Sequence, residues 1–397
     1  MFGSSTKQNP QPITVHSLAH GHDGKRDSVL ECASPLALLP ANVRSRRFLP
    51  FVCLSLLVTL QPLPAQTTNL PPIPLTAVKT WAYQIQDVPT AGAVDALAQS
   101  RYDLLVVEPS RTDWSSPENR RFDTPGMVRR LQAAPAGDGT HRRLVLAYLD
   151  IGEAETWRWY WTWPKDWTKG RPRPAGLPAF IIHPDPDGWS GDFPVVFWDP
   201  VWRDILLSGD RTPPAPDRTY RSLMDEVLQS GFDGVYLDWV EAYDDPAVKS
   251  AARTAGVDPA REMIRLLGAI RDCGRRRNPA FVVIQQNAAD LLTGHPELLN
   301  VIDAIGQEDV WYSGAADSDW NNPKGHDQRT SAGQTRETLQ LLQPFRAAGK
   351  PVFTVDYTVP DAPATYRRAR AAGFVPYCTR VSLSRLTTTP PPELATP

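Results

Sequence analysis

The chain has 397 residues, of which 40 are proline and 25 are glycine. This glycine content excludes collagen, which needs glycine at every third position, and a hydrophobic fraction of 41% argues against wholesale disorder. The formal net charge of −2 argues against a broad electrostatic surface for nucleic acid, so no nucleic-acid partner is expected.

Residues 1–65 have the composition of a leader that is removed. Residues 1–43 hold no sustained apolar pattern, and a basic cluster at 44–47 is followed by an apolar run at 48–60. This run is shorter than the roughly 20 residues of a membrane span. Together with small residues near Ala65, it predicts a secretory signal peptide that is cleaved after that residue. A buried core helix is the alternative, but Pro50 disfavours it.

We therefore expect a secreted or periplasmic protein without stable membrane insertion. Cys53 lies in the apolar run without the preceding small residues of a lipoprotein site, so lipid anchoring is not expected. After cleavage, Cys273 and Cys378 remain, and either one disulfide or two separate buried thiols fits them. The histidines show no ligand spacing, so neither a metal site nor another cofactor is expected.

The rest of the chain is predicted to hold one folded domain. Residues 66–79 read as a Pro/Thr-rich linker, and residues 385–397 read as a disordered Thr/Pro-rich tail. Between them, residues 80–384 alternate short apolar strands with amphipathic helices. The expected strands are 81–86, 104–108, 144–150, 234–238, 281–286, 304–308, 352–357 and 374–378.

Helices are expected between most of these strands, at 91–100, 220–230, 259–277 and 335–348. Strands that alternate with helices indicate an α/β protein with a parallel sheet. Eight such units predict a single (β/α)8 barrel of the TIM type. An open doubly wound sheet is the rival, although no glycine-rich phosphate-binding motif follows any strand. A ninth candidate strand, 195–199, falls in a long third βα loop rich in tryptophan and proline.

Carboxyl and amide side chains end most of the predicted strands. In a barrel of this kind the catalytic groups lie at the carboxyl ends of the strands, and here those positions hold Gln86, Glu108, Asp150, Asp238, Gln286, Glu308 and Asp356. A ring of carboxylates with aromatic residues nearby is typical of a carbohydrate site, because glycosidases use two carboxyl groups and aromatic faces cover sugar rings. The alternative for the tryptophan-rich loop is a satellite hydrophobic core.

Four segments resemble a known enzyme family in content and order. They are the stretch 146–155, which contains Leu149-Asp-Ile-Gly-Glu-Ala-Glu155, and the stretches Phe197-Trp-Asp-Pro-Val-Trp202, Gly231-Phe-Asp-Gly-Val-Tyr-Leu-Asp-Trp-Val-Glu-Ala-Tyr243 and Gly306-Gln-Glu-Asp-Val-Trp311. These segments resemble glycoside hydrolase family 114, the endo-α-1,4-polygalactosaminidase family, over nearly all of the predicted mature chain. The resemblance implies a barrel that cleaves α-1,4-linked galactosamine within a polysaccharide. The family pattern would have Ser in place of Asp150, which puts a catalytic role for Asp150 in doubt.

The resemblance implies that the two catalytic carboxylates are Asp238 and Glu308. We predict Asp238 as the nucleophile and Glu308 as the general acid/base of a retaining mechanism, with retention implied by the family alone. Eight further residues are candidates for substrate binding: Tyr83, Asp150, Glu153, Tyr236, Trp239, Gln286, Trp311 and Asp356. For the tyrosines, a place in the barrel interior is the open alternative.

Two other functions remain open on the sequence. One is a glycosidase of another linkage specificity, and the other is a non-catalytic barrel that binds polysaccharide. The presence of both Asp238 and Glu308 weighs against the second.

Overall fold

A computed structural model of the chain describes residues 70–109, 120–186, 188–211, 220–315, 320 and 327–394. The predicted leader and signal peptide, at 1–65, lie outside these residues. Within the described ranges, no helix is both long and apolar enough to cross a membrane.

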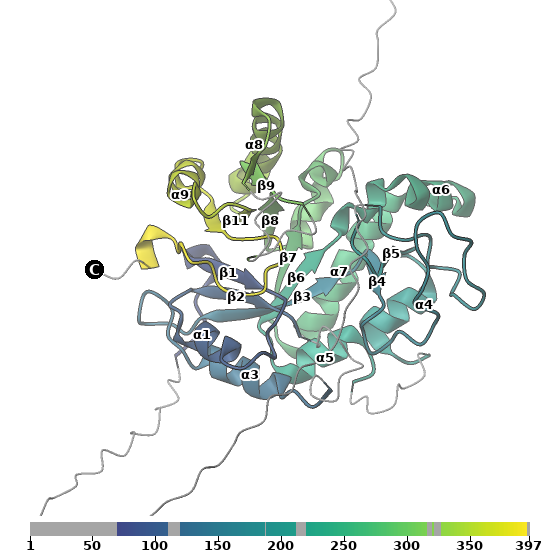
Figure 1. Cartoon of the computed structure of the whole chain (residues 1–397), viewed down its shortest axis with the longest axis horizontal. Helices are drawn as coiled ribbons and strands as arrows, with labels where there is room; N and C mark the ends of the chain where they lie inside the picture. The colour runs from purple at the N-terminus through teal and green to yellow at the C-terminus, as the bar shows by residue number, and fades with distance from the viewer. Residues whose placement is uncertain are drawn as a thin grey trace, which may run out of the picture. The chain divides into compact units, whose positions relative to one another are not determined.

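Eight parallel strands form one nearly closed sheet, which confirms the predicted (β/α)8 barrel (Figure 1). Neighbours around the sheet follow the chain order of the eight strands. Each strand was predicted to within three residues of its observed ends. The strands are β1 (Trp81–Gln84), β2 (Leu104–Val107), β3 (Leu144–Asp150), β6 (Gly234–Asp238), β7 (Val282–Gln286), β8 (Ala304–Glu308), β11 (Val352–Asp356) and β12 (Val375–Cys378).

Amphipathic helices surround this sheet and bury their apolar stripes against it (Figure 1). Most of them begin with a side-chain cap; for example, Asp258 caps α7 by accepting from the N–H groups of Ala260 and Arg261. The helices are α1 (Ala93–Gln99), α3 (Thr124–Gln132), α4 (Pro200–Arg203), α5 (Leu223–Ser230), α6 (Pro246–Ala255), α7 (Pro259–Arg277), α8 (Ala332–Ala347) and α9 (Ala362–Ala371). Short strands β9 (Tyr312–Ser313) and β10 (Gln328–Arg329) form a hairpin above β8.

The seam between β1 and β12 is closed by side chains and by the chain that follows β12. No ladder joins these two strands in the described part of the protein. Instead, the rings of Trp81 and Tyr377 lie 6.0 Å apart across the seam. The N–H groups of Ile85 and Gln86 donate to the carbonyl oxygen of Leu383 at 3.0 and 3.2 Å. The C-terminal segment therefore completes the wall of the barrel.

Both predicted domain boundaries differ from the structure. The expected tail is packed as far as residue 394: Tyr366 donates its hydroxyl to the carbonyl oxygen of Thr389 at 2.7 Å, and Arg370 pairs with Glu393 at 2.9 Å. The expected linker is ordered from residue 70, because Ile73 is buried and donates its N–H to Arg142. Proline and threonine content predicted unstructured chain, but tyrosine hydroxyls and neighbouring strands bind both segments.

The long third loop is a small packed unit of its own. It contains the antiparallel hairpin of β4 (Glu153–Glu155) and β5 (Asp192–Pro194), so the ninth strand lies three residues before its predicted position. Trp159, Trp161 and Trp202 are buried in it, and Trp202 donates its indole N–H to the carbonyl oxygen of Ile151. Most of the tryptophans there form a satellite core, which was the alternative to a sugar platform.

The two cysteines of the domain are separate free thiols, Cys273 partly exposed on α7 and Cys378 buried at the end of β12. Of the two arrangements that the sequence left open, the structure therefore has the one without a disulfide.

Candidate active site

The carboxyl ends of the barrel strands carry an unusual backbone. Five non-glycine residues just after β1, β6, β7 and β8 have positive φ angles: Asp87, Trp239, Asn287, Ala288 and Asp309. Such conformations cost energy and cluster at functional sites, where the surrounding structure holds them in place. Here they turn the chain sharply at the point where Asp238 ends β6 and Glu308 ends β8.

Asp238 is held by two hydrogen bonds. Tyr148 donates its hydroxyl to Oδ2 at 2.7 Å, and Trp239 donates its N–H to Oδ1 at 2.7 Å. Burial, and next to it the negative charge of Glu308, raise the pKa of Asp238 to about 7. The charge of Glu308 therefore disfavours the ionised form of Asp238, as a like charge in the same site does.

Glu308 accepts hydrogen bonds from three side chains. Gln286 and Asn287 donate their side-chain amides to Oε2 at 2.6 and 3.3 Å, and the hydroxyl of Tyr357 donates to Oε1. Burial raises the pKa of Glu308, and these three bonds oppose that rise because they favour the ionised form. The Asn287 amide is oriented by its own oxygen, which accepts the Glu308 N–H at 3.0 Å.

Glu241 is a third carboxyl group of this site, and sequence analysis missed it. It lies in the 3-10 turn Val240–Asp244, and its Oε1 accepts from the side-chain amide of Asn287 at 3.1 Å. Burial and then the charge of Asp238 raise the pKa of Glu241 to about 8. The signal available in the sequence was its place three residues after Asp238 in a motif that resembles the family.

Glu241 makes the stability of the fold depend on pH. The folded state keeps this proton to about pH 8, whereas an unfolded glutamate loses it near pH 4.5. The resulting stabilisation is present at low pH and is lost as the pH rises through this interval. Between pH 5.5 and 7.5 the loss from this group is at most about 2.7 kcal/mol, at about 1.4 kcal/mol per pH unit.

We expect the Glu241→Gln variant to lose less unfolding free energy than the wild type between pH 5.5 and 7.5, since its amide does not titrate. Urea unfolding at both pH values measures this difference. The control is Glu337→Gln, which removes an exposed carboxyl group of α8. Between pH 5.5 and 7.5 it should lose as much unfolding free energy as the wild type. Equal pH dependence in the Glu241→Gln variant and the wild type would contradict the prediction.

Four of the predicted substrate contacts have structural partners instead. Asp150 accepts from the N–H groups of Gly152 and Glu153 at 3.0 and 2.8 Å, so its carboxylate closes its own turn. Glu153 is 2% exposed and faces other carboxyl groups of the third loop. Gln286 is buried and holds Glu308, and Asp356 is fully buried and accepts from the N–H groups of Trp311 and Tyr312. In this structure, three of these side chains hydrogen-bond to the loops or to the carboxyl pair, and Glu153 is buried among other carboxyl groups.

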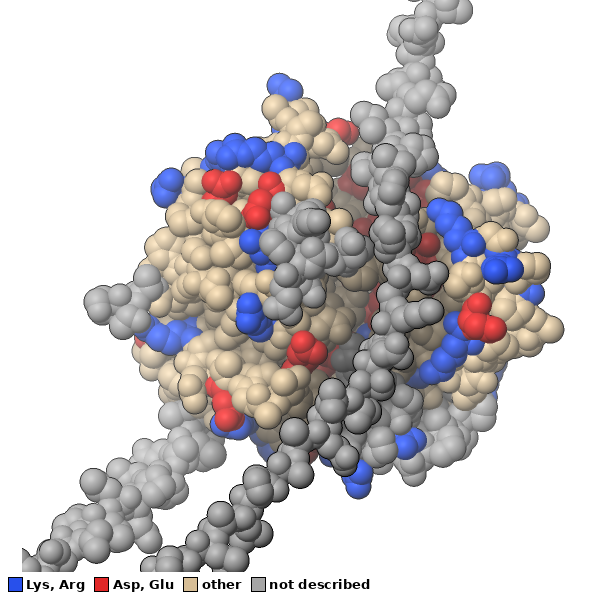
Figure 2. Space-filling view, viewed as in Figure 1, with Lys and Arg blue, Asp and Glu red and all other residues tan. Residues whose placement is uncertain are grey.

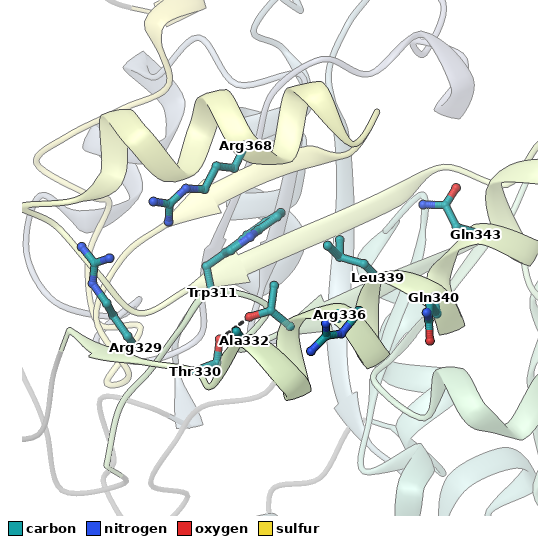
Figure 3. Close-up of a pocket in the computed structure, with 10 residues that line it drawn as sticks. Trp311, Arg329, Thr330, Ala332, Arg336, Leu339, Gln340, Gln343 and Arg368 are labelled. Carbon is teal, nitrogen blue, oxygen red and sulfur yellow. Dashed lines mark hydrogen bonds between the residues drawn. The ribbon is translucent and has the colours of Figure 1, made fainter.

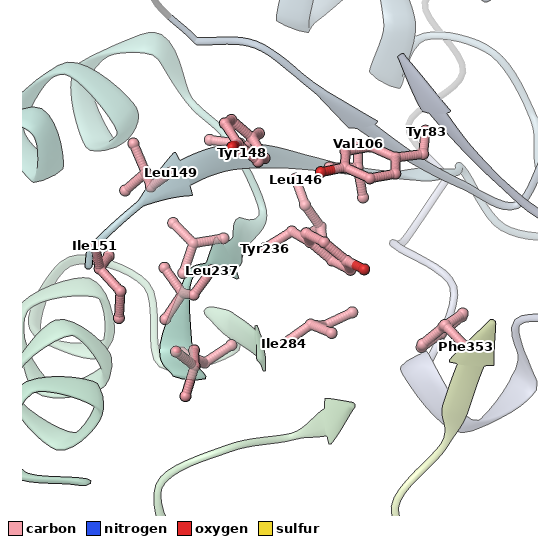
Figure 4. Close-up of a cluster of buried hydrophobic side chains, with 14 of the residues drawn as sticks. Tyr83, Val106, Leu146, Tyr148, Leu149, Ile151, Tyr236, Leu237, Ile284 and Phe353 are labelled. Atoms are coloured by element: carbon pink, nitrogen blue, oxygen red, sulfur yellow. The ribbon is translucent and has the colours of Figure 1, made fainter. Parts of the chain in front are cut away.

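Tyr83 and Tyr236 fill the barrel interior, as the open alternative had it (Figure 4). Their ring centroids are 5.1 Å apart, and Tyr83 donates its hydroxyl to the amide oxygen of Gln286 at 3.1 Å. Both rings lie in the core, so neither presents a face to substrate. Tyr83 instead supports Gln286, which in turn binds Glu308.

The two predicted tryptophan contacts separate in the structure. Trp239 follows Asp238 directly and keeps part of its surface exposed beside the carboxyl pair. Trp311 is 9% exposed, and that surface lines a different cavity, between α8 and α9. Trp239 is therefore the predicted aromatic residue that remains available to a sugar bound at Asp238.

Gly306 lets the interior tyrosine and β8 pack together. A Cβ atom at this position would lie 2.2 Å from the hydroxyl oxygen of Tyr236. We expect the Gly306→Ala variant to be destabilised by about 1–3 kcal/mol, because overpacking forces neighbours out of place. Thermal or urea unfolding measures the loss.

The control for this variant is Gly268→Ala on α7. A Cβ atom there meets only Val301 Cγ1, at 3.4 Å, so this variant should be as stable as the wild type or up to about 1 kcal/mol more stable. Equal stability of the two variants would contradict the packing argument.

Charge is distributed unevenly over the face seen in Figure 2. Some aspartate and glutamate side chains are visible in its recessed middle and others lie on the outer parts, whereas lysine and arginine lie mainly on the outer parts (Figure 2). A recessed group of carboxylates concentrates its negative potential and attracts a cationic ligand.

A barrel with two half-buried carboxyl groups at the ends of strands β6 and β8 is equipped for the hydrolysis of glycosidic bonds. The sequence profile of the glycoside-hydrolase family GH114 matches residues 62–393, so the chain belongs to this family. The family predicted from the four sequence segments is thereby confirmed.

Individual relatives agree with this assignment. An uncharacterised protein of Deinococcus radiodurans is 33% identical over 336 residues, which cover 81% of this chain and 90% of the relative. Another, from Methanocaldococcus jannaschii, is 28% identical over 75% of this chain and 74% of its own length. The glycoside hydrolase domain of PelA from Pseudomonas aeruginosa has a similar fold, with a TM-score of 0.53 and 19% identity, over 79% of this chain and 98% of that domain.

Proposed function

We propose that the protein is a secreted, endo-acting glycoside hydrolase that cleaves α-1,4-linked galactosamine-containing polysaccharide with retention of configuration. The observation that carries the proposal is the pair Asp238 and Glu308, each held by side-chain donors at the ends of β6 and β8, the strands on either side of β7. Membership of family GH114 supports hydrolase activity, and the acidic recess supports a cationic amino sugar as the substrate.

In this proposal Asp238 attacks the anomeric carbon and Glu308 donates a proton to the departing oxygen. A covalent glycosyl-enzyme forms, and water activated by Glu308 then hydrolyses it. Tyr148 and the Trp239 N–H hold Asp238 in position for attack. Gln286, Asn287 and Tyr357 hold Glu308, the proposed proton donor, through hydrogen bonds.

The reaction needs Asp238 ionised and Glu308 protonated. Burial raises the pKa of both groups, that of Asp238 to about 7, and three donors oppose the rise at Glu308. A bound ammonium group beside Asp238 would stabilise the Asp238 carboxylate. An amino sugar would thus favour the ionised nucleophile that its own cleavage needs.

Secretion is part of the proposal and rests on the sequence. The basic cluster at 44–47 and the apolar run at 48–60 support export. N-terminal sequencing of the native protein should find a first residue near Gln66. A stable mature form that still carries residues 1–40 would contradict this part of the proposal.

The test is product analysis after incubation with galactosaminogalactan. Protein that begins at Gln66 should release new reducing ends and a series of short oligosaccharides, and NMR of the first products should show the α-anomer. The double variant Asp238→Asn/Glu308→Gln is the matched blank. Saturable binding without new reducing ends would point to a non-catalytic barrel, and activity confined to other glycans would point to another linkage specificity.

A further inference from the structure

A cavity of about 500 Å³ lies between α8 and α9, apart from the carboxyl pair (Figure 3). Its volume falls within the range of roughly 300–1,000 Å³ that is typical of small-molecule sites. Figure 3 shows the Trp311 indole between the two helices, with Arg368 on α9, Arg329 on β10 and Arg336 on α8 around it. Leu339 adds apolar surface to the same cavity.

Among the described residues, the cavity is lined by three arginines and by no acidic side chain. Arg329 lies 3.6 Å from Asp361 and over the ring of Tyr312, so it is partly neutralised. In the described part of the protein, no carboxylate forms an ion pair with Arg336 or Arg368. Asp356, which Arg368 influences through space, is fully buried behind the backbone of Trp311. The described lining of the cavity therefore has a net positive charge.

This combination indicates a ligand with two properties. Guanidinium groups form paired hydrogen bonds with carboxylate and phosphate groups. An indole face next to leucine covers an apolar ring face, as in sugar recognition. Gln340 and Gln343, which line the same cavity, can donate to and accept from hydroxyl groups.

We propose that this cavity binds a sugar that carries an anionic group, a carboxylate or a phosphate, with the sugar ring against Trp311 and the anion between Arg336 and Arg368. This site differs from the site of Asp238 and Glu308 in two ways: its charge is positive, and its proposed ligand is anionic. The proposal does not depend on the hydrolytic function.

The experiment measures binding in the Glu308→Gln background, so that hydrolysis does not interfere. The probes in calorimetric titrations are digalacturonate and glucose 6-phosphate, with neutral digalactose and inorganic phosphate as comparisons. We expect saturable binding of at least one anionic sugar, weakened at least tenfold by Arg336→Gln/Arg368→Gln. The matched control, Arg277→Gln/Arg367→Gln, removes two exposed positive charges elsewhere and should bind as the parent does.

Each outcome decides the proposal. Binding of digalacturonate identifies a carboxylated sugar, and binding of glucose 6-phosphate alone identifies a phosphorylated one. No binding of either probe, or equal weakening in both double variants, would overturn it. If inorganic phosphate binds as tightly as either anionic sugar, the sugar ring adds nothing to the affinity. The proposed contact of the ring with Trp311 would then be wrong, and the proposal would be overturned. Circular dichroism melts of all variants separate lost binding from lost folding.

Discussion

Replacing Asp238 by Asn is expected to lower kcat on the polysaccharide about 10³-fold or more, because an amide cannot serve as the nucleophile. The fold should be retained, since Asn has the shape of Asp, its amide oxygen can still accept from the N–H of residue 239, and its NH2 group can donate to the hydroxyl oxygen of Tyr148. Initial rates of reducing-end formation, together with a thermal melt, measure both effects.

Asp150→Asn is the matched control for this variant. Asp150 and Asp238 are register partners at the ends of neighbouring strands β3 and β6. The Asp150 carboxylate accepts only from its own turn through Oδ1, and an amide oxygen preserves those two bonds. We expect less than a tenfold loss of kcat. A loss as large as that of Asp238→Asn would contradict the assignment of Asp238 as the nucleophile and of Asp150 as a residue that only closes its own turn.

Replacing Glu308 by Gln is expected to lower kcat about 10²–10⁴-fold on the natural polymer, because the departing sugar is no longer protonated. The size of the loss should depend on the leaving group. An oligosaccharide with a dinitrophenyl leaving group needs no protonation, so its first bond should break at nearly the wild-type rate. Stopped-flow absorbance should then show a burst of the phenol, followed by slow turnover as the glycosyl-enzyme waits for water.

The same substrate separates the two proposed roles. Asp238→Asn should give no burst, because no covalent intermediate forms without the nucleophile. If the burst appears in Asp238→Asn and is absent in Glu308→Gln, the nucleophile and the acid/base are exchanged. Bursts in neither variant, with equal losses on both substrates, would argue against a covalent intermediate.

The strands and the barrel could be predicted because their signals are local. Apolar runs such as 144–150 and 234–238 are bounded by polar or turn residues, and the observed β3 and β6 have those same limits. The catalytic candidates at their ends followed from one rule about barrels, that function lies at the carboxyl ends of the strands. Chain order then determined the strand order without further information.

Side-chain direction could not be predicted in the same way. Strands of a barrel are buried on both faces, so hydrophobicity does not reveal which residues point inward. Tyr83 and Tyr236 therefore looked like equally good sugar contacts and interior residues. Trp311 was predicted as a substrate contact, yet its backbone N–H donates to Asp356 and its side chain lines the cavity between α8 and α9.

Glu241 escaped prediction for a conformational reason. It follows a strand end by three residues, where a side chain usually belongs to a loop or to a helix start. The positive φ of Trp239 turns the chain back. Glu241 can therefore accept a hydrogen bond from Asn287, the residue that follows β7. A single-residue backbone state of this kind leaves little trace in composition, because tryptophan rarely adopts it.

The seam beside β1 has a consequence for how the molecule is made. The side-chain amide of Gln84 donates to the carbonyl oxygen of Ser384, which is 300 positions further along the chain. At about 5–20 residues per second, a ribosome needs roughly 15–60 s to synthesise that interval. Throughout this time β1 is an unpaired edge along its outer side, open to association with other nascent chains. Folding helpers that shield exposed strand edges during synthesis should therefore raise the yield of this barrel.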